Sequence, residues 1–138
     1  MAISFSFQKK INLHSRTKLK EWINKTAEQR EKKIGNISYI FCSDDELLQI
    51  NNQYLKHDYY TDVITFDYSE GAVLNGDIFI SVDRVRDNAK QVGVTFEEEL
   101  YRVMIHGVLH LSGVNDKTEQ QAKQMRKAEE DSLKLLFG

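Results

Sequence analysis

The sequence predicts an α+β domain in which a small mixed four-stranded sheet is covered by packed helices. Its 138 residues match the length of one domain, so residues 1–138 are expected to fold as a single unit. Segments that alternate apolar and polar residues indicate strands, and segments with apolar residues three or four apart indicate helices. These segments follow the order β-α-β-α-β-β-α-α-α, which is not a strict alternation of strands and helices.

The first third of the chain predicts a strand, a helix and a second strand. Apolar residues alternate over 3–8, which favours a half-buried strand. A basic amphipathic helix is expected over 16–33, ending near Gly35. Alternation over 37–41 predicts the second strand. Cys42 follows it, and this single cysteine is expected to be buried and unpaired.

The middle of the chain predicts a helix and a hairpin. A Ser-x-x-Glu capping box favours a helix over 43–54. β-branched and aromatic residues predict a strand over 61–68. Asn75-Gly76 is typical of a hairpin turn, so a returning strand is expected over 77–82.

Three helices are expected to close the chain. The first covers 82–92 and ends at Gly93. The second opens with a Thr-x-x-Glu capping box, covers 95–112 and ends at Gly113. The third, over 118–137, carries apolar residues on one face.

Charge and hydropathy limit the class of protein. Lys and Arg number 19 and Asp and Glu number 21, so the net charge of -2 does not favour nucleic-acid binding through bulk charge alone. No apolar run approaches the roughly 20 residues that span a bilayer, and the N-terminus lacks the order of a secretory signal. A cytoplasmic protein without a membrane partner is therefore expected.

The charge is unevenly distributed along the chain. Residues 1–40 carry nine Lys or Arg and three acids, a net charge of +6, whereas residues 41–80 carry one Lys and eight acids, a net charge of -7. This asymmetry favours one basic face and one acidic region near a site. The alternative is two ordinary solvated surfaces.

The segment HGVLHLSGVND, residues 106–116, carries the strongest chemical signal. His106 and His110 are four apart on an expected helix, so their imidazoles share one face, with about 5–6 Å between the Cβ atoms. Gly113 ends this helix and lets the chain fold back. Asp116 follows three residues later and can supply a third ligand.

Two neutral imidazoles and a carboxylate suit a tetrahedral zinc ion with one position open to water, whose pKa would be about 7. We therefore predict one zinc ion per chain, held by His106, His110 and Asp116. The alternative is that the two histidines belong to the core. Gly107 stands where zinc peptidases of the H-E-x-x-H type have their glutamate base, which argues against peptide hydrolysis.

Three separated segments together resemble the YbeY family of bacterial metal-dependent endoribonucleases. HGVLHLSG resembles the family signature H-G-x-L-H-L-x-G. Residues 52–58 and 61–66 resemble the family segment N-x-x-Y-R-x-x-D-x-P-T-D-V-L-S-F, and residues 76–78 resemble its G-D-I strand. The order and spacing of these segments agree across about residues 45–120.

The resemblance implies a zincin-like metal helix, with His106 and His110 as ligands by position. It implies an endoribonuclease specific for single strands, which hydrolyses phosphodiesters with a zinc-bound water. Its role would be to mature the 3′ end of small-subunit ribosomal RNA and to serve ribosome quality control. Ribosomal RNA is the implied partner, together with ribosomal proteins or a ribosome-associated GTPase.

The chain departs from the family pattern at several positions. Asp116 stands where the family has a third histidine, and aspartate can also bind zinc. Leu55 stands where the family has an arginine that would bind phosphate. Lys56 or His57 is the candidate replacement, unless both are surface residues. Asp62 is expected to orient a metal-bound histidine or to cap its loop, and either role is favoured over direct catalysis.

Two other functions fit the same residues. A non-catalytic ribosome-associated factor with a structural metal would fit the missing arginine at Leu55. Another metal hydrolase, acting on peptides or small molecules, would fit the ligand pattern alone. No general base can be named from the sequence.

Overall fold

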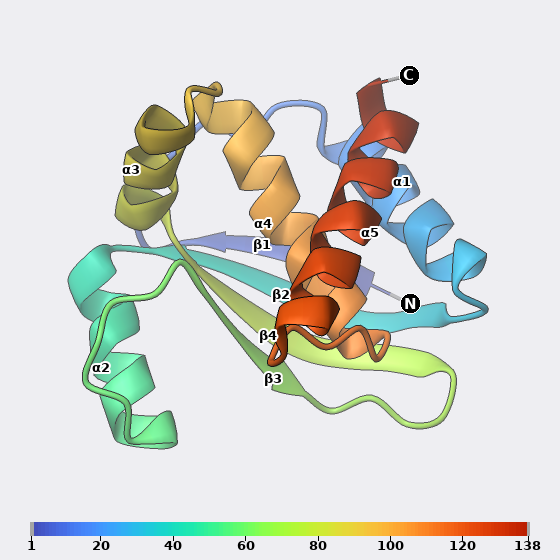
Figure 1. The fold of residues 1–138 in the computed structure, drawn as a ribbon, viewed down its shortest axis with the longest axis horizontal. Coiled ribbons are helices and arrows are strands. Elements are labelled where there is room, and N and C mark those ends of the chain that lie inside the picture. The colour runs from blue at the N-terminus through green and yellow to red at the C-terminus, as the bar shows by residue number, and fades with distance from the viewer. Residues whose placement is uncertain (1, 138) are drawn as a thin grey trace.

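The computed structural model describes residues 2–137, which form a four-stranded sheet with helices on both faces (Figure 1). The elements are β1 (Ala2–Phe7), α1 (Arg16–Gln29), β2 (Lys33–Cys42), α2 (Asp44–Leu55), β3 (Val63–Asp67), β4 (Val73–Ser81), α3 (Val82–Val92), α4 (Phe96–Leu111) and α5 (Glu119–Phe137). Between residues 2 and 137, no helix combines the length and apolar character needed to cross a membrane. The α+β class and the order of elements are confirmed.

The sheet is mixed, as predicted, and its strands lie in the order β1-β2-β4-β3. β1 pairs with β2 in parallel, and β2 pairs with β4 in parallel. β3 is an edge strand and runs antiparallel to β4. The start of β3 therefore lies at an open edge of the sheet, where neighbouring helices can reach it.

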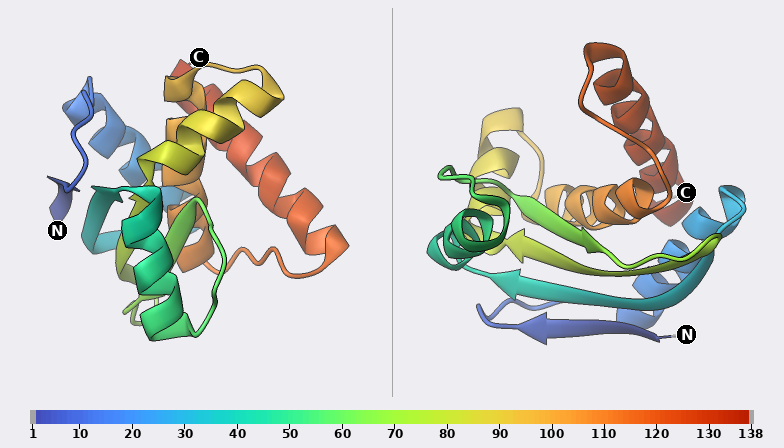
Figure 2. Two further views of the ribbon diagram at one scale, coloured as in Figure 1. Left: turned by 90° about the vertical axis from the view of Figure 1, so that its left-hand side faces the viewer. Right: turned by 90° about the horizontal axis from the view of Figure 1, so that it is seen from below.

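The two faces of the sheet are covered unequally (Figure 2). α1 and α4 pack on one face and α5 packs on both of them, which encloses the main core. Tyr39 is fully buried there, and its hydroxyl donates to the carbonyl of Met104 at 2.9 Å. α2 covers the other face through a smaller cluster around Cys42, Leu47 and Ile64. Cys42 is buried, as predicted.

Several helices begin or end at the capping residues that the sequence predicts. The hydroxyl of Ser43 accepts from the N–H of Glu46, and the Glu46 carboxylate accepts from the N–H of Ser43, which completes a capping box. Gly93 follows α3 with a φ of 76°, and Gly113 follows α4 with a φ of 99°. Glycine adopts this left-handed conformation without strain, so both helices end where predicted.

The helix predicted over 16–33 is too long. α1 ends at Gln29, and Glu31, with a φ of 59°, turns the chain into β2. Gly35 lies inside β2 rather than after a helix, and a Cβ at this position would collide with the side chain of Asn75. The absence of a side chain at Gly35 lets β2 and β4 approach each other closely.

The Asn75-Gly76 pair is not a hairpin turn, contrary to the prediction. Both residues lie inside β4, and the turn comes earlier, around Gly71 with a φ of 58°. The Asn75 side-chain oxygen accepts from the N–H of Asn36 at 2.8 Å, where the register of β2 is irregular. Gly76 leaves room for the carbonyl of Phe66.

Replacing Gly76 by alanine tests this packing role. A Cβ would lie 2.6 Å from the Phe66 carbonyl oxygen and 3.1 Å from the Leu111 side chain. Gly76→Ala should therefore lower the free energy of unfolding by about 1–3 kcal/mol in urea titrations. Gly71→Asn is the control, because no atom lies within 4 Å of its Cβ position and asparagine tolerates a left-handed backbone. Equal losses in the two variants would contradict the packing argument.

Candidate metal centre and active site

α4 and the turn that follows it position the predicted metal ligands. The hydroxyl of Thr95 accepts from the N–H of Glu98 and starts the helix. At the other end, the N–H of Gly113 donates to the His110 carbonyl at 3.1 Å, and the next N–H donates to the Leu109 carbonyl at 3.0 Å. These bonds reverse the chain and bring the segment with Asp116 back toward α4.

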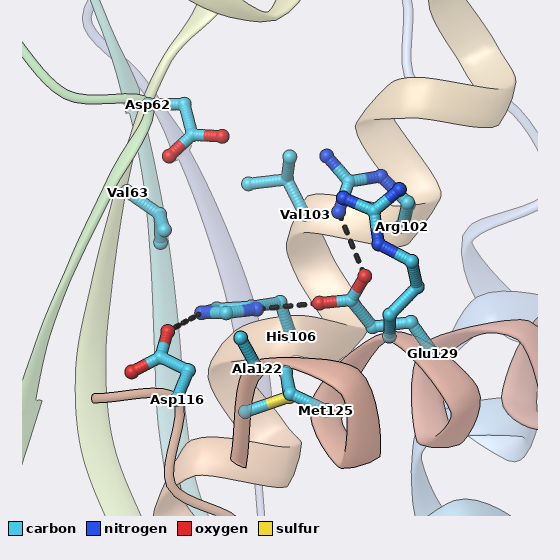
Figure 3. A pocket seen from close by; sticks show the side chains of 10 residues that line it. Asp62, Val63, Arg102, Val103, His106, Asp116, Ala122, Met125 and Glu129 are labelled. Atoms are coloured by element: carbon cyan, nitrogen blue, oxygen red, sulfur yellow. Dashed lines mark hydrogen bonds and ion pairs between the residues drawn. The ribbon is translucent and has the colours of Figure 1, made fainter. Parts of the chain in front are cut away.

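His106 lies between two carboxylates, one from this turn and one from α5 (Figure 3). Its Nδ1 is 2.6 Å from Oε2 of Glu129, and its Nε2 is 3.5 Å from Oδ2 of Asp116. The imidazole side chain is 21% exposed, whereas that of Glu129 is only 4% exposed. The ring is therefore held in one orientation, with Nε2 facing Asp116.

Glu129 also joins a chain of buried ion pairs. Arg102 donates to Oε1 of Glu129 at 2.7 Å, and its other nitrogens contact the carboxylate of Glu99. Glu99 is buried as well. Both carboxylates therefore share one guanidinium, which offsets part of their desolvation.

This pairing changes the pKa of both Glu129 and His106. Burial alone would lower the pKa of His106, but the hydrogen bond and the charge of Glu129 outweigh it and raise that pKa. Burial alone would raise the pKa of Glu129, but the hydrogen bonds from His106 and Arg102 outweigh it and lower that pKa. An ionised carboxylate only accepts hydrogen bonds. His106 therefore donates from Nδ1, and in the neutral ring Nε2 keeps its lone pair for a ligand on the side of Asp116.

His106 and Asp116 fit a zinc ion in spacing and chemistry. Two ligands of one tetrahedral zinc, each bonded at about 2.0–2.1 Å, lie about 3.3 Å apart, close to the 3.5 Å between Nε2 of His106 and Asp116. The carboxylate behind His106 matches the usual partner of a zinc-bound histidine. Two of the three predicted ligand side chains thus lie at a spacing that a zinc ion would accept.

The second histidine does not converge on the same point. The rings of His106 and His110 are nearly parallel, at 4°, and their centroids lie 6.5 Å apart. Across residues 2–137, no three His, Cys, Asp or Glu side chains lie close enough together to hold a metal ion. Nδ1 of His110 is nevertheless buried without a hydrogen-bond partner in the described chain.

The predicted site residue Asp62 lies in the same cavity as His106. This cavity has a volume of about 190 Å³ and lies between the start of β3, α4 and α5. Burial raises the pKa of Asp62, and the charge of nearby His106 opposes that rise. The amide of Asn88 contacts its carboxylate at 3.5 Å. No hydrogen bond joins the side chains of Asp62 and His106 in the described structure, so the orienting role of Asp62 stays a prediction.

Lys56 and His57 lie away from this cavity, on the loop that follows α2. Lys56 caps α2 in a left-handed conformation. The His57 ring stacks on Tyr59, whose hydroxyl is 3.0 Å from Nδ1 of His57. Neither residue lines the cavity that contains His106, so their role in binding phosphate stays a prediction.

Gly107 explains why a peptidase glutamate is absent. A Cβ at this position would lie 2.8 Å from Cδ1 of Ile78 on β4, because α4 packs directly on the sheet there. A longer side chain has no room, so the H-E-x-x-H arrangement is sterically incompatible with this helix. The packing disfavours the alternative of a zinc peptidase.

Three further residues line the cavity without being predicted from the sequence: Arg102, Arg126 and Glu129. Glu129 lies four residues after Met125, on the face of α5 that packs inward. A charged residue at an apolar position of a helix is the signal that could have identified it.

Replacing Glu129 by glutamine should destabilise the fold, because the neutral amide leaves the Arg102 and His106 partners incompletely paired. The expected loss in free energy of unfolding is roughly 2–4 kcal/mol, measured by urea denaturation. Glu130→Gln is the matched control on an exposed neighbouring position, and its effect should stay below about 0.5 kcal/mol. If both variants unfolded at the same urea concentration, the buried pairing would not contribute to stability.

Comparisons with known proteins agree with this structure. The family model described as Endoribonuclease YbeY matches residues 3–136. Endoribonuclease YbeY of Bacteroides thetaiotaomicron is 52% identical over 115 residues, which cover 83% of this chain and 84% of that protein. The protein of the same name from Flavobacterium psychrophilum is 49% identical over 133 residues, which cover 96% of this chain and 95% of that protein.

A solved structure shows the same fold. The solution structure of a protein from Thermotoga maritima matches with a TM-score of 0.63 at 28% sequence identity, and the match covers 95% of this chain and 89% of the other. The family match and the relatives cover most or nearly all of the chain, including the segment with His106, His110 and Asp116. The chain therefore belongs to the endoribonuclease YbeY family.

Proposed function

We propose that this protein is a zinc-dependent endoribonuclease that cleaves single-stranded RNA in the cytoplasm. Its substrate would be the 3′ end of small-subunit ribosomal RNA, and its role would include ribosome quality control. The observation that carries the proposal is the approach of His106 to Asp116, at 3.5 Å, in a cavity at the surface of an endoribonuclease-family fold.

His106, His110 and Asp116 would hold the zinc ion. His106 and Asp116 already have the spacing of two ligands, and His110 would have to turn toward them. A bound zinc ion would supply Lewis-acid chemistry for the hydrolysis of a phosphodiester. One imidazole and one carboxylate that face each other, with a second imidazole on the same helix, make a donor set typical of zinc.

The surrounding residues would orient His106 and leave room for a substrate phosphate. Glu129 keeps the proton of His106 on Nδ1, and Arg102 holds Glu129 in place. The cavity volume of about 190 Å³ is several times the roughly 30 Å³ of a water molecule, which leaves room for a phosphodiester group. Arg126 contributes a cationic side chain to the wall.

A protein partner would help to bring this enzyme to its RNA. The net charge is -2, so unspecific attraction to RNA is weak. A ribosomal protein or a ribosome-associated GTPase would supply the missing affinity. Lys56 and His57 would add contacts to the RNA backbone on their exposed loop.

Metal analysis together with an RNA cleavage assay tests the proposed function. Purified wild-type protein should contain about one zinc per chain, and both His106→Ala and Asp116→Ala should lose most of it. Cleavage of a single-stranded ribosomal RNA fragment should fall by about 100-fold or more in each variant. His14→Ala, which removes an exposed histidine, is the control and should keep metal and activity.

Two outcomes would contradict parts of this proposal. Equal zinc content in Asp116→Ala and the wild type would remove Asp116 from the site. A wild-type protein that binds zinc but cleaves no RNA, with variants that lose stability when the metal is lost, would favour the non-catalytic factor with a structural metal.

A further inference from the structure

A second cavity adjoins the one that contains His106. It has a volume of about 250 Å³ and lies between the α3–α4 turn, α4 and α5. Its lining includes Val92, Val94, Glu98 and Leu133. Arg102 and Arg126 line both cavities, and their side chains form the boundary that the two cavities share, which we call the junction.

Arg126 is the cation available at this junction. Arg102 is already engaged by the carboxylates of Glu99 and Glu129. In the part of the chain from residue 2 to 137, no side-chain hydrogen bond or ion pair engages Arg126. A phosphate that reached the junction would pass near Asp62 and Asp116, and Arg126 can offset their repulsion with a bidentate contact.

The second cavity offers apolar surface beside this cation. Val92 is 66% exposed and Val94 is 38% exposed, on either side of the left-handed Gly93. Leu133 of α5 lies on the opposite wall. A nucleotide combines an apolar base face with an anionic phosphate, and unpaired bases of single-stranded RNA can be splayed out into such a space. The exposed carboxylate of Glu98 can accept hydrogen bonds from a base or a ribose hydroxyl.

We infer that the second cavity binds the nucleotide adjacent to the cleaved bond, with its base against Val92, Val94 and Leu133 and its phosphate on Arg126. This inference rests on the proposed endoribonuclease function. Because Arg126 lines both cavities, a nucleotide whose phosphate contacts Arg126 can place its base in the second cavity, and we therefore assign this cavity to the substrate strand itself. The cavity would then select unpaired RNA, because a base inside a duplex cannot enter it.

Steady-state cleavage of a short single-stranded RNA tests the phosphate contact. Arg126→Ala should raise KM by about tenfold and change kcat less than twofold, since it removes substrate binding and leaves the His106 site intact. Lys127→Ala is the matched control, because this neighbouring lysine is exposed and pairs only with Asp131 at 3.6 Å among the described residues. Equal KM values in the two variants would overturn the assignment of Arg126.

Abasic nucleotides test the base contact. In the wild type, an abasic position on one side of the cleaved bond should raise KM severalfold. In the double variant Val92→Ala, Val94→Ala the same abasic position should raise KM less, because part of the apolar contact is already lost and only Leu133 keeps its full side chain. An abasic penalty that is the same in both proteins at every position would overturn the nucleotide site.

A binding measurement separates this inference from the proposed function. If the wild type cleaves no RNA, the endoribonuclease proposal fails. Fluorescence anisotropy with the same labelled RNA then tests the phosphate contact of Arg126 in the absence of cleavage. Weaker binding by Arg126→Ala than by Lys127→Ala would support an RNA site there, and equal binding by the two variants would overturn it.

Discussion

The arrangement of α4 and α5 depends on the buried carboxylate of Glu129. It accepts hydrogen bonds from His106 and Arg102, both on α4, so α5 cannot slide along α4 without leaving buried charges unpaired. The loop that carries Asp116 joins these two helices, and their register therefore limits where it can lie. The hydrogen bond between Glu129 and His106 therefore contributes to helix packing and also orients Nε2 of the imidazole toward Asp116.

Stability alone does not account for this buried charge network. Apolar residues of similar volume often stabilise a helix interface as well as a buried ion pair does, because both ions must lose their water. Here the network ends on His106 and keeps the proton on the nitrogen that faces away from Asp116. A functional reason for retaining Glu99, Arg102 and Glu129 is therefore more consistent with the geometry than a purely structural one.

The sequence was informative where the relevant residues are close together in the chain. One helix and its terminal turn contain His106, His110 and Asp116, so helical spacing was enough to select them. Glu129 was missed because its pairing with His106 depends on how α5 crosses α4. The prediction of a hairpin turn at Asn75-Gly76 was wrong because this pair is typical of such turns. In the structure the pair lies inside β4, and the side chain of Asn75 accepts a hydrogen bond from Asn36 of β2, which is distant in sequence.

The low net charge of the chain agrees with RNA as substrate once charge is considered locally. A net charge of -2 describes the average, but the residues that meet a substrate are those that line the cavities. Asp62 and Asp116 face that space, and Arg102 is committed to its own carboxylates. Among the described cavity residues, a phosphate would bind best at Arg126, because this side chain is not paired with a carboxylate. We therefore expect recognition through a few contacts, with an affinity for RNA that is modest and sensitive to salt.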